Sequence, residues 1–212
     1  MYPLLAALTD EQREVTIPPS RTWYMPVTLD QGQQGACVGF GWSYELAGYP
    51  VPIRGVTNEF ARDIYLTAQR DYDEWAGENY SGTSVLAGAK TVTARGYLQD
   101  YLWGFSLDDV VRAIAYKGPV VLGLSWYTGM FSPESDGRIR PTGQIEGGHC
   151  IVARQVRTDS YFVTSKRRRI GLRNSWGNWG PLGPDCYMTW DDMERLLNEG
   201  GEACLPGTRL RP

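Results

Sequence analysis

The pattern of apolar and polar positions divides the chain into a helical first half and a strand-rich second half. After Cys37 the apolar residues lie nearly all round a helix that stops at Gly48 to Pro50, which predicts a buried central helix. Apolar faces, N-cap residues and closing glycines predict three further helices, at Thr57 to about Tyr72, Ser84 to Arg95 and Ser106 to Tyr116.

From Val120 onward the chain predicts short strands, at 120–126, 149–156, 160–164, 170–173 and 186–189. A late helix is predicted at 190–197, with Thr189 as its N-cap. Helices followed by strands indicate an α+β protein with two segregated lobes. We expect a peripheral segment at residues 1–20 and one domain at 21–212. Its helical lobe would span about 21–118 and its antiparallel β lobe about 119–212.

Composition narrows the class of protein. The 212 residues are 42% apolar and 21% charged, as in an ordinary globular chain, and the net charge of -3 does not favour nucleic acid as a partner. No apolar run is long enough for a transmembrane helix, and Met1 to Thr9 lack the features of a signal peptide, so neither a membrane partner nor export is expected. With four cysteines, none in a C-x-x-C pair, and one histidine, we expect no metal and no cofactor.

Cys37 is the first candidate for chemistry, because it stands at the start of the predicted central helix after Gly32 and Gly35. A helix N-terminus favours a negatively charged sulfur, and the glycines let backbone N–H groups approach a substrate. A small buried apolar residue is an equally good interpretation of a free cysteine from position alone.

His149 is the second candidate. It follows Gly147 and Gly148 and opens a predicted strand. Side chains alternate along a strand, so if His149 faces a cleft, Cys150 faces the core. A lone histidine is more often structural than catalytic, but the flanking glycines let this backbone face a cleft closely.

The third candidate is the segment Asn174-Ser175-Trp176-Gly177. An Asn amide can accept the imidazole N–H and fix its tautomer, and Trp176 can screen that hydrogen bond from water. The same residue types also favour an ordinary turn.

Together these residues resemble the papain-like cysteine peptidases. The matching motifs are Gln31-Gly32, Gly35-Ala36-Cys37, Gly148-His149 and Asn174-Ser175-Trp176-Gly177 followed by Trp179-Gly180, in the family's order of Cys, His and Asn. The resemblance covers about residues 21–190, strongly only at the motifs. It implies a two-lobed α+β fold, with the cysteine on a central helix of the N-terminal lobe and the active-site cleft between the lobes.

The resemblance also implies a role for each matching residue. Cys37 is the nucleophile of a peptidase that acts through a thioester, His149 the general base and acid paired with the thiolate as an imidazolium, and Asn174 the group that orients His149. The Gln31 side chain and the Cys37 N–H form the oxyanion hole. A polypeptide substrate is expected to lie along a set of five residues: Gly82, Thr83, Gly35, Gly148 and Trp176.

The chain departs from the family in ways that limit the comparison. Gln34 replaces a cysteine that normally forms a disulfide, and Val38 replaces an aromatic residue. The segment between Cys37 and His149 is shorter than the roughly 130 residues of secreted members. Because only 36 residues precede Cys37, we expect no inhibitory pro-region of the kind usual in the family. We expect a compact bacterial or phage-type member, located in the cytoplasm of the bacterium or infected host, or on a virion.

Two alternatives stay open beside the peptidase. One is a cell-wall amidase or transpeptidase that uses the same triad. The other is a non-catalytic protein, associated with a virion or a complex, on a peptidase scaffold. Three smaller questions also stay open: whether Cys186 and Cys204 pair, whether Trp126 and Tyr127 line a subsite or the core, and whether residues 1–20 occlude the cleft.

Overall fold

The computed structural model describes residues 17–75, 80–158 and 168–210. Its helices follow the predicted ones closely. They are α3 (Cys37–Ala47), α4 (Asn58–Thr67), α5 (Val85–Ala94), α6 (Leu107–Tyr116) and α7 (Trp190–Asn198), with a π-helical turn η1 (Ala68–Tyr72) that continues α4 and a 3-10 turn η2 (Thr128–Met130). All the predicted helices are present, whereas the strand predicted at 160–164 lies outside the described residues.

Local chemistry sets the starts of four of these helices. The side chains of Thr57, Ser84, Ser106 and Thr189 each accept a hydrogen bond from the backbone N–H three residues on. Such caps satisfy one of the unpaired donors at a helix N-terminus and are worth about 1 kcal/mol each. The N-caps predicted at Ser106 and Thr189 are therefore confirmed.

The strands of the described residues form one antiparallel sheet of seven strands. They are β1 (Ser20–Thr22), β2 (Tyr101–Gly104), β3 (Val120–Tyr127), β4 (Ile145–Arg157), β5 (Arg169–Arg173), β6 (Asp185–Thr189) and β7 (Glu202–Pro206). Their order is β2-β7-β3-β4-β5-β6, and β1 pairs with the far end of β4. The sequence did not predict β1, β2 or β7. β7 joins the sheet between β2 and β3, far from both in sequence.

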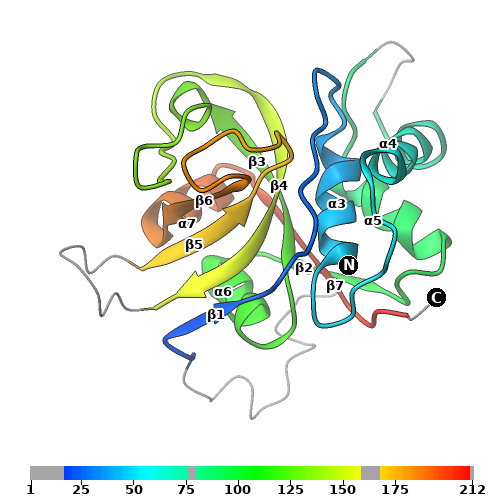
Figure 1. Ribbon diagram of the computed structural model, residues 1–212, viewed down its shortest axis with the longest axis horizontal. Helices are drawn as coiled ribbons and strands as arrows, with labels where there is room; N and C mark the ends of the chain where they lie inside the picture. The colour runs from blue at the N-terminus through cyan, green and yellow to red at the C-terminus, as the bar shows by residue number, and fades with distance from the viewer. Residues whose placement is uncertain (1–16, 76–79, 159–167, 211–212) are drawn as a thin grey trace.

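The two faces of the sheet pack against different helices. Side chains alternate along β3 and β4, so Val121 and Cys150 face one way while Leu122 and Ile151 face the other. The first set packs against α3, and the second set packs with α6 and α7. Figure 1 shows α3 beside the sheet, with α4 and α5 beyond it and α7 on the opposite side. The α+β fold with a central helix is confirmed.

One helix does not follow the chain order of the expected lobes. α6 precedes the expected lobe boundary at about residue 118, yet Val110, Val111 and Ile114 belong to the core on the sheet's far face. The sheet core thus draws residues from both halves of the chain.

The C-terminal segment returns to the central helix. The Arg209 guanidinium donates to the Glu45 carboxylate and carbonyl, and to the carbonyls of Gly48 (2.7 Å) and Val51 (2.9 Å). Glu45 is fully buried, and burial lowers the pKa of Arg209 to about 9. A buried carboxylate needs a paired cation, so this contact fixes the end of α3 to the segment after β7.

Candidate active site

Cys37 is the first residue of α3, as the sequence predicts. Ala36 stands at the N-cap and supplies no side-chain hydrogen bond, so the first N–H groups of the helix are not capped by a side chain. The Cys37 side chain is half-buried and lines a cleft of about 480 Å³. This is a position from which a thiol can reach a substrate.

His149 lines the same cleft as Cys37 and belongs to strand β4. His149 pairs with Leu124 of β3. The pairing of β3 with β4 shifts by one residue at Glu146, just before Gly147 and Gly148. Such a bulge re-aims the strand beside it. The neighbouring Cys150 points away from the cleft and packs over Gly41 of α3, as alternation predicts.

Asn174 lies directly against the histidine. Its Oδ1 is 2.8 Å from His149 Nε2 and also accepts the backbone N–H of Ser175 at 2.8 Å. An amide oxygen is an acceptor only, so Nε2 carries the proton and Nδ1 is left as the basic nitrogen. Because Asn174 is fully buried, this hydrogen bond is shielded from water.

Gln31 is held next to Ser175, the neighbour of Asn174, by one backbone and one side-chain hydrogen bond. Its backbone N–H donates to the Ser175 carbonyl (2.8 Å), and its Oε1 accepts from Ser175 Oγ (2.6 Å). Its Nε2 donates to the carbonyl of Gln34 at 2.8 Å. A side-chain amide has two N–H groups, so the second one is free to donate to a ligand.

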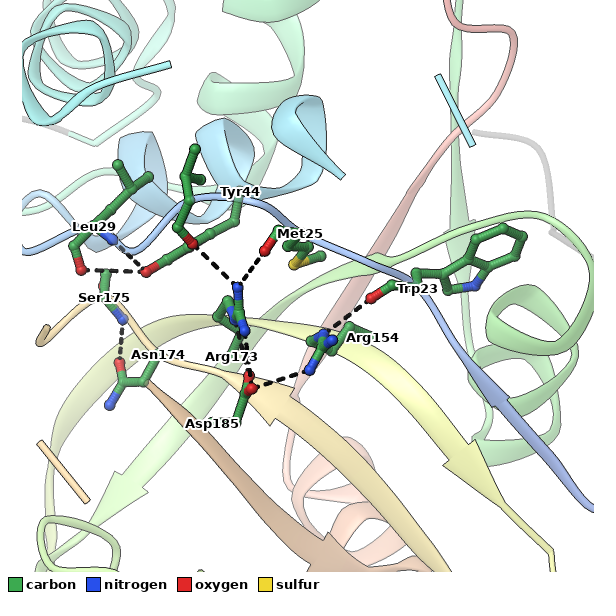
Figure 2. A network of polar contacts seen from close by, with 10 residues as sticks. Trp23, Met25, Leu29, Tyr44, Arg154, Arg173, Asn174, Ser175 and Asp185 are labelled. Carbon is green, nitrogen blue, oxygen red and sulfur yellow. Dashed lines mark hydrogen bonds and ion pairs between the residues drawn. The ribbon is translucent and has the colours of Figure 1, made fainter. Parts of the chain in front are cut away.

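A buried polar network supports this corner of the site (Figure 2). Arg173, which precedes Asn174, forms a double ion pair with Asp185 (2.8 Å for both contacts) and donates to the carbonyl of Met25 (2.8 Å). Tyr44 of α3 holds Leu29 by its N–H (2.6 Å) and its carbonyl (3.2 Å). The network ties the segment leading to Gln31 to α3 on one side and to β5 on the other.

Aromatic rings enclose the histidine. Trp126 and Trp176 lie 4.5 and 4.7 Å from the His149 ring, centroid to centroid. Phe131 stacks on Trp176 at 5.5 Å, and Trp179 meets it edge-on at 5.0 Å. Trp176 therefore packs over the His149 ring, whereas the residues that line the cleft do not include it. Trp126 is a core residue, 2% exposed.

Burial acts on the Cys37 thiol and on the His149 imidazole, which both line the cleft. It raises the pKa of the Cys37 thiol, while backbone N–H groups of Cys150, Val38 and Cys37 lower it by smaller amounts. It lowers the pKa of His149 to about 4, against a smaller opposing effect of the hydrogen bond with Asn174. Each effect favours the neutral form of its group. The thiolate–imidazolium pair implied by the resemblance stays a prediction, and burial opposes it.

The residues expected to bind substrate divide into two groups. Gly82, Thr83 and Gly148 line the cleft. Gly35 does not, but a side chain there would clash with Ser81, because its Cβ would lie 2.1 Å from Ser81 Oγ. Gly35 thus lets the segment 81–82 approach the helix start. A Cβ at Gly148 would meet nothing within 4 Å, so the β4 wall of the cleft is open at that point.

Sequence reasoning missed two side chains at the site. Ser175 holds Gln31, and Glu202 of β7 lines the cleft. Ser175 stands inside a recognised motif, so its position could have indicated a role. Glu202 gave no such signal, because its place depends on how β7 pairs with β3.

The remaining expectations concern cysteines, metals and membranes. Cys186 and Cys204 are free thiols in separate cores, so they do not pair. Over residues 17–75, 80–158 and 168–210 no three metal-ligating side chains are grouped. Within the same residues no helix has the length and apolar character needed to cross a membrane.

Comparison with solved structures identifies the fold. Xylellain, a cysteine protease from Xylella fastidiosa, matches with a TM-score of 0.68 at 17% identity, over 92% of this chain and 88% of that one. The chain has the papain-like fold. The same fold is found in the Carica candamarcensis cysteine protease CMS1MS2 in complex with E-64, with a TM-score of 0.64 at 15% identity, over 92% of this chain and 100% of that one.

A third papain-like structure is the digestive procathepsin L 3 of Tenebrio molitor larval midgut. It matches with a TM-score of 0.64 at 13% identity, over 93% of this chain and 72% of that one. No protein-family model matches the chain, and no curated protein matches it in sequence. The likeness is therefore one of fold, and the residues of the site carry the argument for function.

Proposed function

We propose that the protein is a cysteine peptidase that cleaves polypeptides through a thioester on Cys37. One observation carries the proposal. Cys37 at a helix start and His149 on a strand line one cleft, and Asn174 fixes the imidazole through a buried 2.8 Å hydrogen bond. This is the combination of nucleophile, base and orienting group that acyl transfer needs. The papain-like fold supports the same assignment.

The first half of the reaction forms the acyl-enzyme. His149 Nδ1 takes the thiol proton as Cys37 Sγ attacks the scissile carbonyl carbon. The negative charge that develops on the carbonyl oxygen is stabilised by the Cys37 N–H and the free N–H of Gln31. When the tetrahedral intermediate collapses, the C–N bond breaks, and His149 gives its proton to the leaving amine.

The second half releases the product. His149 takes a proton from a water molecule, whose oxygen attacks the thioester carbonyl carbon. The same two N–H groups stabilise the second oxyanion. The C–S bond breaks, the acid leaves, and the proton held by His149 returns to Cys37. An extended substrate would pair its backbone with Gly82 and Thr83 on one wall and lie against Gly148 on the other.

The experiment that tests the function compares the unsubstituted protein with Cys37→Ala on an unfolded polypeptide, with the products identified by mass. We expect new chain ends with the unsubstituted protein and none with Cys37→Ala. Cys186→Ala is the matched control, because Cys186 is buried in the sheet core away from the cleft. It should cleave at a normal rate.

The alternatives give different results. Release of fragments from cross-linked cell-wall peptides without cleavage of polypeptides would assign the triad to a cell-wall amidase or transpeptidase. Absence of turnover on both, with no effect of Cys37→Ala on binding or assembly, would favour a scaffold protein.

A further inference from the structure

Four arginines share one face of the sheet, and none of them lines the catalytic cleft. Arg154 and Arg157 stand on β4, and Arg169 and Arg173 stand on β5. We call these four residues the arginine face. The register pairs Arg157 directly with Arg169, so their side chains leave the same face with Cβ atoms about 5 Å apart. Like charges directly opposite one another destabilise a sheet, so this pair does not contribute to its stability.

Two members of the arginine face share a single carboxylate. The guanidiniums of Arg154 and Arg173 bind Asp185 at 3.0 Å and 2.8 Å. Burial lowers the pKa of Arg154, and the charge of Arg173 lowers it further, against the opposing effect of Asp185. One carboxylate between two guanidiniums leaves one positive charge without compensation at this end of the face.

The other two members have no carboxylate partner in the part of the chain that the structure describes. Within that part, the Nε of Arg157 is buried and has no hydrogen-bond acceptor. Arg169 lies over the Tyr187 ring, 4.7 Å from its centroid, and the Tyr187 hydroxyl donates to Asp136 at 2.5 Å. A buried donor without an acceptor is costly, so an anionic oxygen that reaches Arg157 would be bound favourably.

The surplus of positive charge is local to this face. The whole chain carries a net charge of -3, so general basicity does not account for it. Three other arginines of the β lobe are each paired with a carboxylate: Arg138 with Asp192, Arg140 with Glu134 and Arg195 with Glu199. The arginine face is therefore a part of the lobe in which guanidiniums remain available to a ligand.

A cavity of about 340 Å³ lies on this face of the sheet. Arg154, Arg169 and Asp185 line it, and Leu182 forms part of its wall. Leu182 is 50% exposed, although it is an apolar side chain. The cavity thus presents cationic groups to an anion and, beside them, an apolar surface to an aliphatic group.

We propose that the arginine face binds an acidic segment of a polypeptide, with carboxylates on Arg154, Arg157 and Arg169 and an apolar side chain on Leu182. Guanidiniums bind carboxylates through charge-assisted hydrogen bonds, which are often bidentate. The exposed leucine favours a polypeptide over nucleic acid or free phosphate, because neither of those carries an aliphatic side chain beside its anionic groups. The proposal is independent of the peptidase function, since these residues lie outside the catalytic cleft.

The test measures binding of a fluorescein-labelled peptide of repeated Glu-Glu-Leu by fluorescence anisotropy, with a Gln-Gln-Leu peptide for comparison. The full chain with Cys37→Ala is used, so that the probe is not cleaved. We expect binding of the Glu peptide that weakens with added salt, and much weaker binding of the Gln peptide. In Arg157→Gln, Arg169→Gln the Kd for the Glu peptide should rise by roughly tenfold or more, because charge-assisted contacts are lost. Equal binding of the two peptides would overturn the proposal.

The matched control is the double variant Arg54→Gln, Arg62→Gln. Both arginines are exposed on the helical lobe, so their substitution removes the same charge from a different surface. The Kd for the Glu peptide should stay within about twofold of its original value. An equal rise of Kd in the two double variants would mean that the overall charge of the protein, not a contact on the arginine face, sets the affinity, and would overturn the proposal.

A second measurement needs no substitution on the arginine face. Phenylglyoxal modifies accessible arginines, and peptide mapping locates each modified side chain. An excess of the Glu peptide should slow modification of Arg157 and Arg169 severalfold and leave the rate at Arg54 unchanged. Equal protection of all three arginines, or of none, would contradict the proposed contact. Tighter binding of oligothymidylate or inorganic phosphate than of the Glu peptide at Arg157 and Arg169 would assign the face to another ligand and overturn the proposal.

Discussion

Asn174 Oδ1 lies 2.8 Å from His149 Nε2, and the backbone N–H of Ser175 donates to the same oxygen. The Ser175 N–H therefore orients the Asn174 amide, and the amide in turn orients the imidazole of His149. A side chain held in this way fixes the tautomer and leaves Nδ1 toward the cleft.

Asn174→Ala should lower kcat/KM by up to roughly 100-fold, since a misplaced base costs about that much. It should also lower the pKa of His149 further, because the hydrogen bond with Asn174 raises that pKa. The exposed Asn178, four residues on, provides the control. Asn178→Ala should change neither quantity, and equal effects of the two substitutions would argue against an orienting role for Asn174.

The single histidine makes its pKa directly measurable by NMR. In Cys37→Ala, where no thiolate can offset burial, we predict a pKa of about 4 for His149. The difference between this value and that of the unsubstituted protein measures how strongly a Cys37 thiolate stabilises the imidazolium. A value near 6.5 in Cys37→Ala would contradict the effect assigned to burial.

The lowered pKa of His149 makes the stability of the folded protein depend on pH. His149 has a lower pKa in the folded protein than in the unfolded chain, so the unfolded state binds more protons between pH 4 and 6.5. The contribution of His149 to the free energy of unfolding is complete above about pH 6.5 and falls as the pH drops toward 4, by about 3 kcal/mol. Denaturant titrations of the unsubstituted protein and His149→Phe, compared at pH 7 and pH 4, should differ by that amount. The same change in the free energy of unfolding between pH 7 and pH 4 in both proteins would contradict the prediction.

Gln31 is expected to stabilise the oxyanion through the N–H that Gln34 does not use. Gln31→Ala should lower kcat by roughly 100- to 1000-fold with a smaller effect on KM. Ser175→Ala, which removes only the contact to Gln31 Oε1, should have a weaker effect in the same direction. The exposed neighbour Gln33 serves as the control, and a drop in kcat for Gln33→Ala of the same size would remove the special role of Gln31.

The buried pair between Glu45 and Arg209 should matter for stability rather than for chemistry. Arg209→Met leaves the Glu45 carboxylate buried without a cation and should lower the free energy of unfolding by about 3–5 kcal/mol. Chemical denaturation measures the loss, with Arg54→Met at an exposed position as the control. In the double variant Glu45→Gln, Arg209→Met much of the loss should be recovered. A loss in Arg209→Met no larger than in Arg54→Met would show that the pair does not hold the C-terminal segment.

Most of the fold could be predicted because its signals are local. Caps at Thr57, Ser84, Ser106 and Thr189 and the apolar positions after Cys37 depend on neighbouring residues alone. Strands β2 and β7 could not be predicted, since each is short and is stabilised by partners about 80 to 100 residues away.

The residues of the site also divide into those that local motifs predict and those that depend on contacts between distant segments. Gln31, Cys37, His149 and Asn174 stand in short motifs, so their residue types and order can be recognised from the sequence alone. The contacts of Trp126 with His149 and of Ser175 with Gln31 depend on packing between distant segments. Glu202 enters the cleft only through the pairing of β7 with β3, which no local pattern encodes.

The acyl-enzyme itself gives the most direct test of the account. A peptide ester is mixed with the protein, the reaction is quenched in acid within milliseconds, and the acyl group is located by peptide mapping. Cys150, Cys186 and Cys204, all buried, are internal controls. We predict the acyl mass on Cys37 alone, and its loss in His149→Ala. Hydrolysis that continues in Cys37→Ala, or an acyl group on any other residue, would contradict the central claim that Cys37 is the nucleophile.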